Sequence, residues 1–188
     1  MLNKEPIINI GVILPQDKRN ELRFSFSNPE NYEIKFQDSK KSHTSENLTV
    51  SINDGDIKIT KIKENEKSVG ITIHDVPAGR NFHWKKMIDV TLPGNIFITT
   101  RDDNLMVINQ VPLEQYLARV AVSEMSSSCP SALLESQTIA ARSWILAGTE
   151  KKHLDLGIDA CNDDCCQRYQ GMGQQTKQSC ETVKKSHG

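Results

Sequence analysis

Residues 111–144 read VPLEQYLARVAVSEMSSSCPSALLESQTIAARSW, and this stretch decides how the chain is organised. From Leu113 onward apolar side chains recur at helical spacing, and Pro112 suits the first turn of a helix, where its missing N–H costs little. Three serines and a proline interrupt the pattern before the apolar spacing resumes. The stretch therefore predicts two helices joined by a short turn, the first ending near Glu124 and the second running to about Gly148.

Residues 6–110 have the opposite character. Short runs rich in β-branched residues alternate with turn residues, and no helical period of any length occurs. Two pairs of runs predict β-hairpins: residues 22–36 around a turn with Asn and Pro, and residues 48–62 around an Asp-Gly pair. We therefore expect an α+β protein with many short, mainly antiparallel strands and with two or three helices forming a helical subdomain.

The last part of the chain completes this division. Residues 176–185 are expected to form a third helix, and the loop before it is expected to contain one strand, at residues 166–170. The chain thus divides into a mostly β part at residues 1–110 and a helical part with a cysteine-rich loop at residues 111–188.

Length and charge exclude some classes of function. The chain has 188 residues, 25% of them charged and 37% hydrophobic, with a formal net charge of -1. Nucleic-acid-binding proteins usually carry a basic excess, so no nucleic-acid partner is expected. No apolar run approaches the roughly 20 residues of a membrane span. The N-terminal segment MLNKEPIINIGVILPQ lacks the basic lead and long apolar run of a signal peptide, and a strand explains it better.

Two charged residues of the helical stretch are candidates for chemistry. Glu124 ends the first helix beside an apolar stripe, where a carboxylate can serve as a general acid. Its alternative is a solvated surface residue. Arg142 lies among small apolar residues and needs a partner, which its planar fork could find in a substrate carboxylate or in a structural ion pair.

Three of the five cysteines fall within residues 161–166. With His153, Cys161 and Cys166 make a three-ligand set for a structural zinc ion. Adjacent cysteines do not easily point at one ion, so we expect at most two of the three, without Cys165, to bind it. A Cys161–Cys166 disulfide and free buried thiols remain alternatives, since none of the spacings is diagnostic.

Three ordered blocks resemble one family, the stage II sporulation protein D family, which includes amidase enhancers. PLEQYLARVAVSEM resembles its "PLEEYLxGVVxxEM" segment, ALLESQTIAARSW is similar to "EALKAQAxAARTYA", and CQRYQG is similar to "CQVYxG". The resemblance covers residues 75–188 well and the earlier strands loosely. Three blocks in this order are much more specific than any one of them.

The resemblance implies a bacterial peptidoglycan lytic transglycosylase that acts on glycan strands without stem peptides. Such an enzyme cleaves the bond between N-acetylmuramic acid and N-acetylglucosamine and leaves 1,6-anhydro-N-acetylmuramic acid ends. It would work outside the cytoplasm, in the cell wall, the periplasm or the forespore-facing space. One alternative is a non-catalytic glycan-binding enhancer of a cell-wall amidase or other cell-wall hydrolase. Another is a structural cell-wall domain.

The resemblance also assigns roles to residues. Glu124 matches the catalytic acid of the family. The substrate-binding or orienting residues would be Arg142, Gln137, Gln167 and Tyr169, and the zinc ligands of some members match His153, Cys161 and Cys166. Glu135 stands where the family has Lys, which places a negative charge at that point. The family's chain continues with further strands, so residues 111–188 are expected to be a helical and metal-loop catalytic part, truncated at its C-terminal end.

Overall fold

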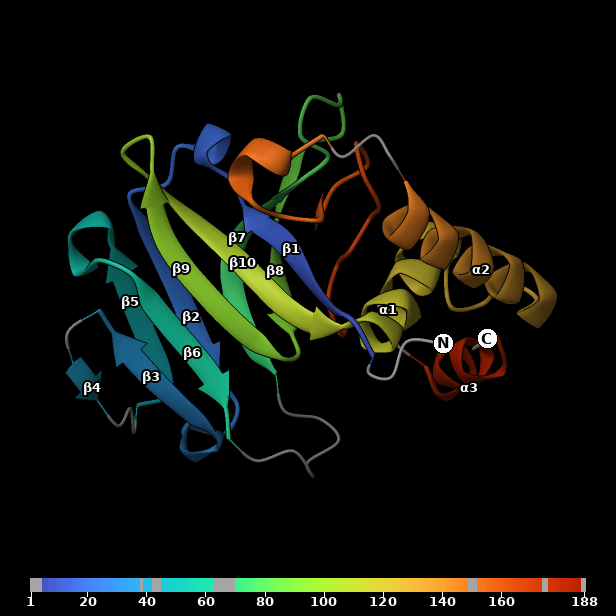
Figure 1. The fold of residues 1–188 in the computed structure, drawn as a ribbon, viewed down its shortest axis with the longest axis horizontal. Helices are drawn as coiled ribbons and strands as arrows, with labels where there is room; N and C mark the ends of the chain where they lie inside the picture. The colour runs from blue at the N-terminus through green and yellow to red at the C-terminus, as the bar shows by residue number, and fades with distance from the viewer. Residues whose placement is uncertain are drawn as a thin grey trace.

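The computed structural model describes residues 5–37, 39–41, 45–62, 70–148, 152–173 and 176–186 (Figure 1). Its strands are β1 (Ile7–Ile13), β2 (Glu21–Phe26), β3 (Tyr32–Phe36), β4 (Ser39–Lys41), β5 (Asn47–Ser51), β6 (Ile57–Lys61), β7 (Ile71–Ala78), β8 (Lys86–Leu92), β9 (Asn95–Arg101), β10 (Asn104–Pro112) and β11 (Ala160–Cys161). Its helices are α1 (Leu113–Met125), α2 (Ser131–Ala147) and α3 (Lys177–Lys185), with short 3-10 turns η1 (Pro15–Asp17), η2 (Pro29–Asn31), η3 (Ile52–Asp54) and η4 (Leu154–Leu156).

The strands form two sheets. A seven-stranded sheet has the order β11-β1-β10-β9-β6-β3-β4, and a four-stranded sheet has the order β5-β2-β7-β8. All the described pairs are antiparallel except the short parallel pair of β1 with β11. The predicted α+β class with mainly antiparallel strands is confirmed.

Both predicted N-terminal hairpins are wrong. β2 pairs with β5 and β7 in the smaller sheet, whereas β3 and β6 pair with each other in the larger one. The turns η2 and η3 therefore carry the chain from one sheet to the other instead of folding it back on its neighbour. The reason is burial. Alternate residues of β2 and β3, such as Phe24 and Ile34, both point into the core, and two facing sheets can cover that core from both sides.

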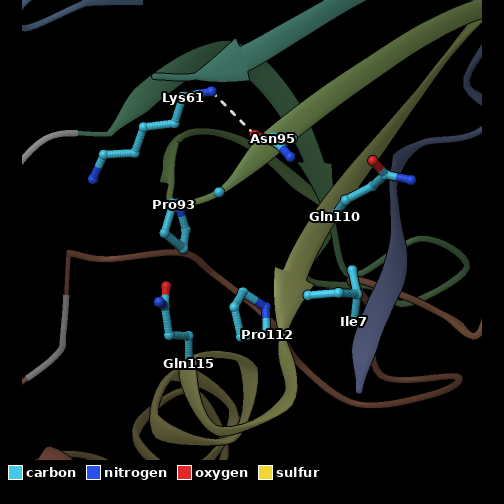
Figure 2. A pocket seen from close by; sticks show the side chains of 8 residues that line it. Ile7, Lys61, Pro93, Asn95, Gln110, Pro112 and Gln115 are labelled. Carbon is cyan, nitrogen blue, oxygen red and sulfur yellow. Dashed lines mark hydrogen bonds between the residues drawn. The ribbon is translucent and has the colours of Figure 1, made fainter. Parts of the chain in front are cut away.

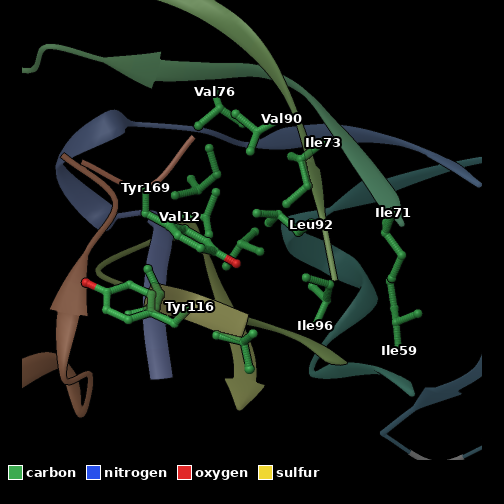
Figure 3. Packing of buried hydrophobic residues seen from close by; sticks show 14 of the residues in the cluster. Val12, Ile59, Ile71, Ile73, Val76, Val90, Leu92, Ile96, Tyr116 and Tyr169 are labelled. Carbon is green, nitrogen blue, oxygen red and sulfur yellow. The ribbon is translucent and has the colours of Figure 1, made fainter. Parts of the chain in front are cut away.

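One hydrophobic core joins the two parts of the chain (Figure 3). Isoleucine and valine side chains from both sheets fill it, among them Ile73 and Ile96. Tyr116 from α1 and Tyr169 from the C-terminal loop pack against them, with their ring centroids 5.3 Å apart. The division at residue 110 therefore does not separate two cores, and it stays a prediction about which part carries the chemistry.

The helices begin and end where the sequence pattern predicts. Pro112 and Pro130 are the N-cap residues of α1 and α2, and the side chain of Thr176 accepts a hydrogen bond from the N–H of Ser179 at the start of α3. No helix in the described part of the chain is long and apolar enough to cross a membrane.

The strand predicted at residues 166–170 is wrong. This segment forms no strand, and its N–H groups have other partners: Arg168 donates to the Glu124 carboxylate, Tyr169 to the Asn162 carbonyl and Gln170 to the Ser123 hydroxyl. Side chains and loop carbonyls thus replace the ladder of a sheet. The segment is held against α1, and this contact brings it to Glu124.

Candidate active site

Glu124 lies in the last turn of α1 and is partly buried. Its Oε1 accepts a hydrogen bond of 2.6 Å from the backbone N–H of Arg168. Within the described ranges, Oε2 has no hydrogen-bond partner. The carboxylate is therefore fixed by one oxygen and has the other available for a ligand.

The carboxylate lines a pocket of about 360 Å³ between α1, α2 and the C-terminal loop. The lining residues are Glu124, Gln137, Ala140, Ala141, Trp144, Asp164, Cys166 and Gln167. Three residues predicted from the resemblance, Glu124, Gln137 and Gln167, thus meet in one place. The Trp144 ring is 37% exposed and gives the polar pocket an apolar wall, which is a combination suited to sugars.

Gln167 is held rigidly in this wall. Its Oε1 accepts a hydrogen bond of 2.8 Å from the buried Tyr116 hydroxyl, and its Nε2 donates to the Ala141 carbonyl at 3.4 Å. Burial raises the pKa of Tyr116 well above its ordinary value, so the phenol stays a donor. Gln167 therefore shapes the pocket and keeps the adjacent Arg168 N–H aimed at Glu124.

Arg142 does not line this pocket. Its Nε and Nη2 bind both oxygens of Glu114 at 3.2 and 2.8 Å, and its Nη1 donates to the Ser186 carbonyl at 2.8 Å. The guanidinium joins α1, α2 and the end of α3. This geometry corresponds to the structural ion pair that the sequence left open as an alternative to substrate binding.

Tyr169 does not reach the pocket surface either. The side chain is fully buried, and its hydroxyl donates to Asn109 Oδ1 at 2.9 Å. Burial raises the pKa of this phenol above its ordinary value. Tyr169 anchors the C-terminal loop in the core, so its position favours support of the site over contact with a substrate.

The predicted metal ligands are gathered beside the pocket. One donor atom each from His153, Cys161, Cys165 and Cys166 lies within 4.8 Å of the others. The Sγ atoms of Cys161 and Cys165 are 3.1 Å apart, and His153 Nε2 is 3.7 Å from Cys165 Sγ. The expectation that at most two of the three cysteines could converge is wrong. A turn closed by the Cys166 N–H and the Asp163 carbonyl brings both adjacent thiols to one point.

These donors fit a zinc ion. Around a tetrahedral zinc with Zn–S bonds of about 2.3 Å, neighbouring sulfurs lie about 3.8 Å apart. The four donor atoms lie within 4.8 Å of one another, and the Cys161–Cys165 sulfur pair, at 3.1 Å, would have to separate slightly to hold the ion. Hydrogen bonds from the thiols of Cys161 and Cys165 lower the pKa of Cys166, which favours the thiolate that a metal requires. All three cysteines are free, so the alternative disulfide is not formed.

A buried ionic network holds the cysteine loop, and the sequence reasoning missed it. Arg80 binds Asp17 through Nε at 2.7 Å and Asn162 through Nη1 at 2.7 Å. The Asp163 carboxylate accepts from the N–H groups of Gly79 and Arg80 at 2.9 and 2.6 Å. No local sequence pattern indicates that Arg80 contacts the cysteine loop. The one available signal is the pair Asp163 and Asp164 between two cysteines, because such carboxylates need hydrogen-bond donors.

A second cavity, of about 530 Å³, lies at the other end of α1 (Figure 2). The lining residues are Ile7, Lys61, Pro93, Gly94, Asn95, Gln110, Pro112 and Gln115. Among the residues that the structure describes, its polar side chains are amides and the Lys61 ammonium group, and none is a carboxylate. No site residue predicted from the sequence lies there.

The fold and the pocket define an α+β protein that presents two carboxylates, Glu124 and the arginine-paired Asp164, in a tryptophan-walled pocket beside a His–Cys cluster. Residues 101–188 match the family model SpoIID, described as Stage II sporulation protein. The predicted family is confirmed: this part of the chain is a stage II sporulation protein domain, and it supports a sporulation role related to the cell wall. Neither the curated proteins nor the solved structures give a match.

Proposed function

We propose that the protein is a peptidoglycan lytic transglycosylase that cleaves glycan strands lacking stem peptides. The observation that carries this proposal is the single accessible carboxylate of the pocket. Glu124 is held by one oxygen and has the other available. A hydrolase of the common kind needs a second carboxylate, as nucleophile or as base for water. A lytic transglycosylase does not.

Asp164, the other carboxylate of the pocket, is already engaged. Its Oδ1 accepts from Nε and Nη2 of Arg168 at 3.0 and 2.6 Å. Its Oδ2 is buried from solvent and has no hydrogen-bond partner in the described structure. An oxygen that water cannot reach cannot deprotonate a water molecule. This arrangement leaves Glu124 as the group that exchanges protons with a bound glycan.

The reaction uses one carboxyl group twice. Protonated Glu124 gives its proton to the oxygen between N-acetylmuramic acid and N-acetylglucosamine. The bond from that oxygen to the anomeric carbon breaks, and its electron pair stays on the leaving oxygen. The 6-hydroxyl of the muramic acid attacks the anomeric carbon and returns its proton to Glu124. The product carries a 1,6-anhydro end, and neither water nor a second acid is consumed.

We further propose that His153, Cys161, Cys165 and Cys166 hold a structural zinc ion. Bound zinc would supply a cross-link within the loop and no step of the reaction. The loop carries Arg168, whose N–H binds Glu124, and Gln167, which binds the Tyr116 hydroxyl. The substrate is a cell-wall polymer, so the proposed location is outside the cytoplasm.

The test is release of anhydro-muropeptides from denuded glycan strands, measured by mass spectrometry. Glu124→Gln should lower the rate by at least about 100-fold, because the amide cannot transfer the proton. Glu181→Gln on the exposed face of α3 is the matched control and should cleave normally. An unchanged rate in Glu124→Gln would refute the assignment. Glycan binding and amidase stimulation without any cleavage by the parent protein would support the enhancer alternative instead.

A further inference from the structure

The turn between β7 and β8, residues 79–85, carries two aromatic side chains at the surface. Phe82 and Trp84 stack with their ring centroids 5.8 Å apart and their planes 23° apart. Phe82 is 45% exposed, and Trp84 is partly exposed. Half of the ten aromatic side chains are buried in the core, so a stacked pair at an exposed turn is a candidate for binding.

The turn is held rigidly. The Asp163 carboxylate accepts hydrogen bonds from the N–H groups of Gly79 and Arg80, which ties the turn to the cysteine loop (Figure 1). Gly79 has a φ of 70°, and a Cβ there would lie 2.5 Å from the Trp84 ring. Trp84 therefore packs directly on the glycine backbone. The aromatic pair is preorganised, which reduces the entropy cost of binding a ligand.

Arg168 connects this pair with the proposed catalytic carboxylate. Its backbone N–H donates to Glu124, and its guanidinium carbon lies 5.2 Å from the centroid of the Trp84 ring. Arg168 thus contacts both groups, the carboxylate through its backbone and the ring through its side chain. A polymer seated in the Glu124 pocket has the aromatic pair within reach of its neighbouring sugars.

We propose that Phe82 and Trp84 form a sugar-stacking subsite for the same glycan strand, adjoining the Glu124 pocket. The identity of this ligand rests on the proposed function. The C–H face of a pyranose ring is apolar and flat, and an exposed aromatic ring offers it a matching surface. Trp144, which lines the Glu124 pocket, provides a second such surface.

Charge favours a strand without stem peptides at this subsite. Each muramic acid carries a lactyl carboxylate, which is free only where the stem peptide has been removed. The exposed lysines Lys85 and Lys86 follow Trp84 directly, and Arg168 lies over its ring. Arg168 is already paired with Asp164, so the two exposed lysines supply the positive charge that attracts an anionic strand more than a neutral one.

The test measures binding of denuded glycan strands to protein that also carries Glu124→Gln, so that the ligand is not consumed. Phe82→Ala and Trp84→Ala should each weaken binding by about 2- to 10-fold, in line with the strength of aromatic pairs. Trp84→Phe should restore most of the loss. Ile62→Ala, an equally exposed apolar residue at the end of β6, is the control and should bind as the parent does. A chito-oligosaccharide, which lacks the lactyl carboxylate, should bind more weakly than the glycan.

Unchanged affinity in Phe82→Ala would overturn the subsite, and this variant keeps the test valid because Phe82 is the more exposed ring. In that event the parent protein would still bind and cleave glycan, and the proposed function would stand. A different result would refute the proposed function: protein with Glu124 unchanged would release no anhydro ends, whichever residue is at position 82. In active protein the Phe82→Ala change should raise KM and leave kcat within about twofold, since the ring acts on binding alone.

Discussion

The two cavities at opposite ends of α1 differ more in chemistry than in size. The one at the C-terminal end, about 360 Å³, contains the Glu124 carboxylate and adjoins the His–Cys cluster. The one at the N-terminal end is larger, about 530 Å³, but is lined by amides, prolines and Lys61. Amides form hydrogen bonds without exchanging protons at neutral pH. The acid–base chemistry that we propose therefore belongs to the smaller cavity, and volume alone would not have selected it.

The chemistry of the two cavities differs because different segments of the chain pack against the two ends of α1. At the C-terminal end, residues 166–170 bring the Arg168 N–H to the Glu124 carboxylate and the Gln170 N–H to the Ser123 hydroxyl. At the N-terminal end the turn at Pro93 and Gly94 brings only carbonyls and amides. A single buried residue supports both ends: Asn109 donates to the Pro93 and Asn95 carbonyls and accepts from the Tyr169 hydroxyl. The cavities share a scaffold and differ in the side chains placed on it.

The largest effect expected, after loss of Glu124 itself, comes from the cysteine cluster beside the smaller cavity. Protein purified without chelator should contain about one equivalent of zinc, and Cys165→Ser should lower zinc affinity by at least about 10-fold, because the proposed site has four donors. Metal analysis and the thermal midpoint measure this. Cys129→Ser, outside the cluster, is the control. Full zinc retention in Cys165→Ser would instead support the site predicted from the sequence, with His153, Cys161 and Cys166 as its three protein ligands.

A smaller effect is expected from the ion pair that joins the helices. Arg142→Gln leaves Glu114 without its bidentate partner at a largely buried position, where the two side chains are 16% and 21% exposed. Stability should fall by about 1–3 kcal/mol, between the values for exposed and for buried pairs. Denaturant unfolding measures it. The folded fraction should retain kcat within about threefold, and a large loss of activity in a fully stable variant would return Arg142 to a role in substrate binding.

The smallest effect is expected at the larger cavity. Gln110→Ala and Gln115→Ala should change the cleavage rate by less than about twofold, because amide groups there hold no proton for the reaction. Gln137→Ala, which removes the same kind of group from the smaller cavity, should cost more. Steady-state rates on denuded strands compare the three. Equal losses of rate at both cavities would mean that the glycan contacts both ends of α1 and that both cavities take part in cleavage.

Local patterns predicted the elements of the fold but not their partners. The helices followed from apolar spacing and from two prolines, which act within a few residues of themselves. The hairpins failed because pairing depends on burial across the whole molecule. β2 and β3 each bury alternate side chains, and alternation is the same whether the next strand pairs in the same sheet or faces it from another.

The candidate site shows the same limit. Glu124, Gln137 and Gln167 were named through a resemblance in motif order, and they line one pocket. Cys165 was set aside by an argument about adjacent residues that a tight turn invalidates. Arg80 and Trp84 lie more than 75 positions before the loop they contact, and spacing along the chain contains no trace of such a contact.

Cleavage by a single carboxyl group, without water, is tested most directly by digesting denuded glycan strands in water enriched in heavy oxygen. Mass spectrometry then measures the new ends. A reaction that uses Glu124 alone predicts muramic acid ends that are anhydro, lighter by one water than hydrolysed ends, and free of heavy oxygen. Reducing ends that carry heavy oxygen would contradict it, since they require a water activated by a second group such as Asp164.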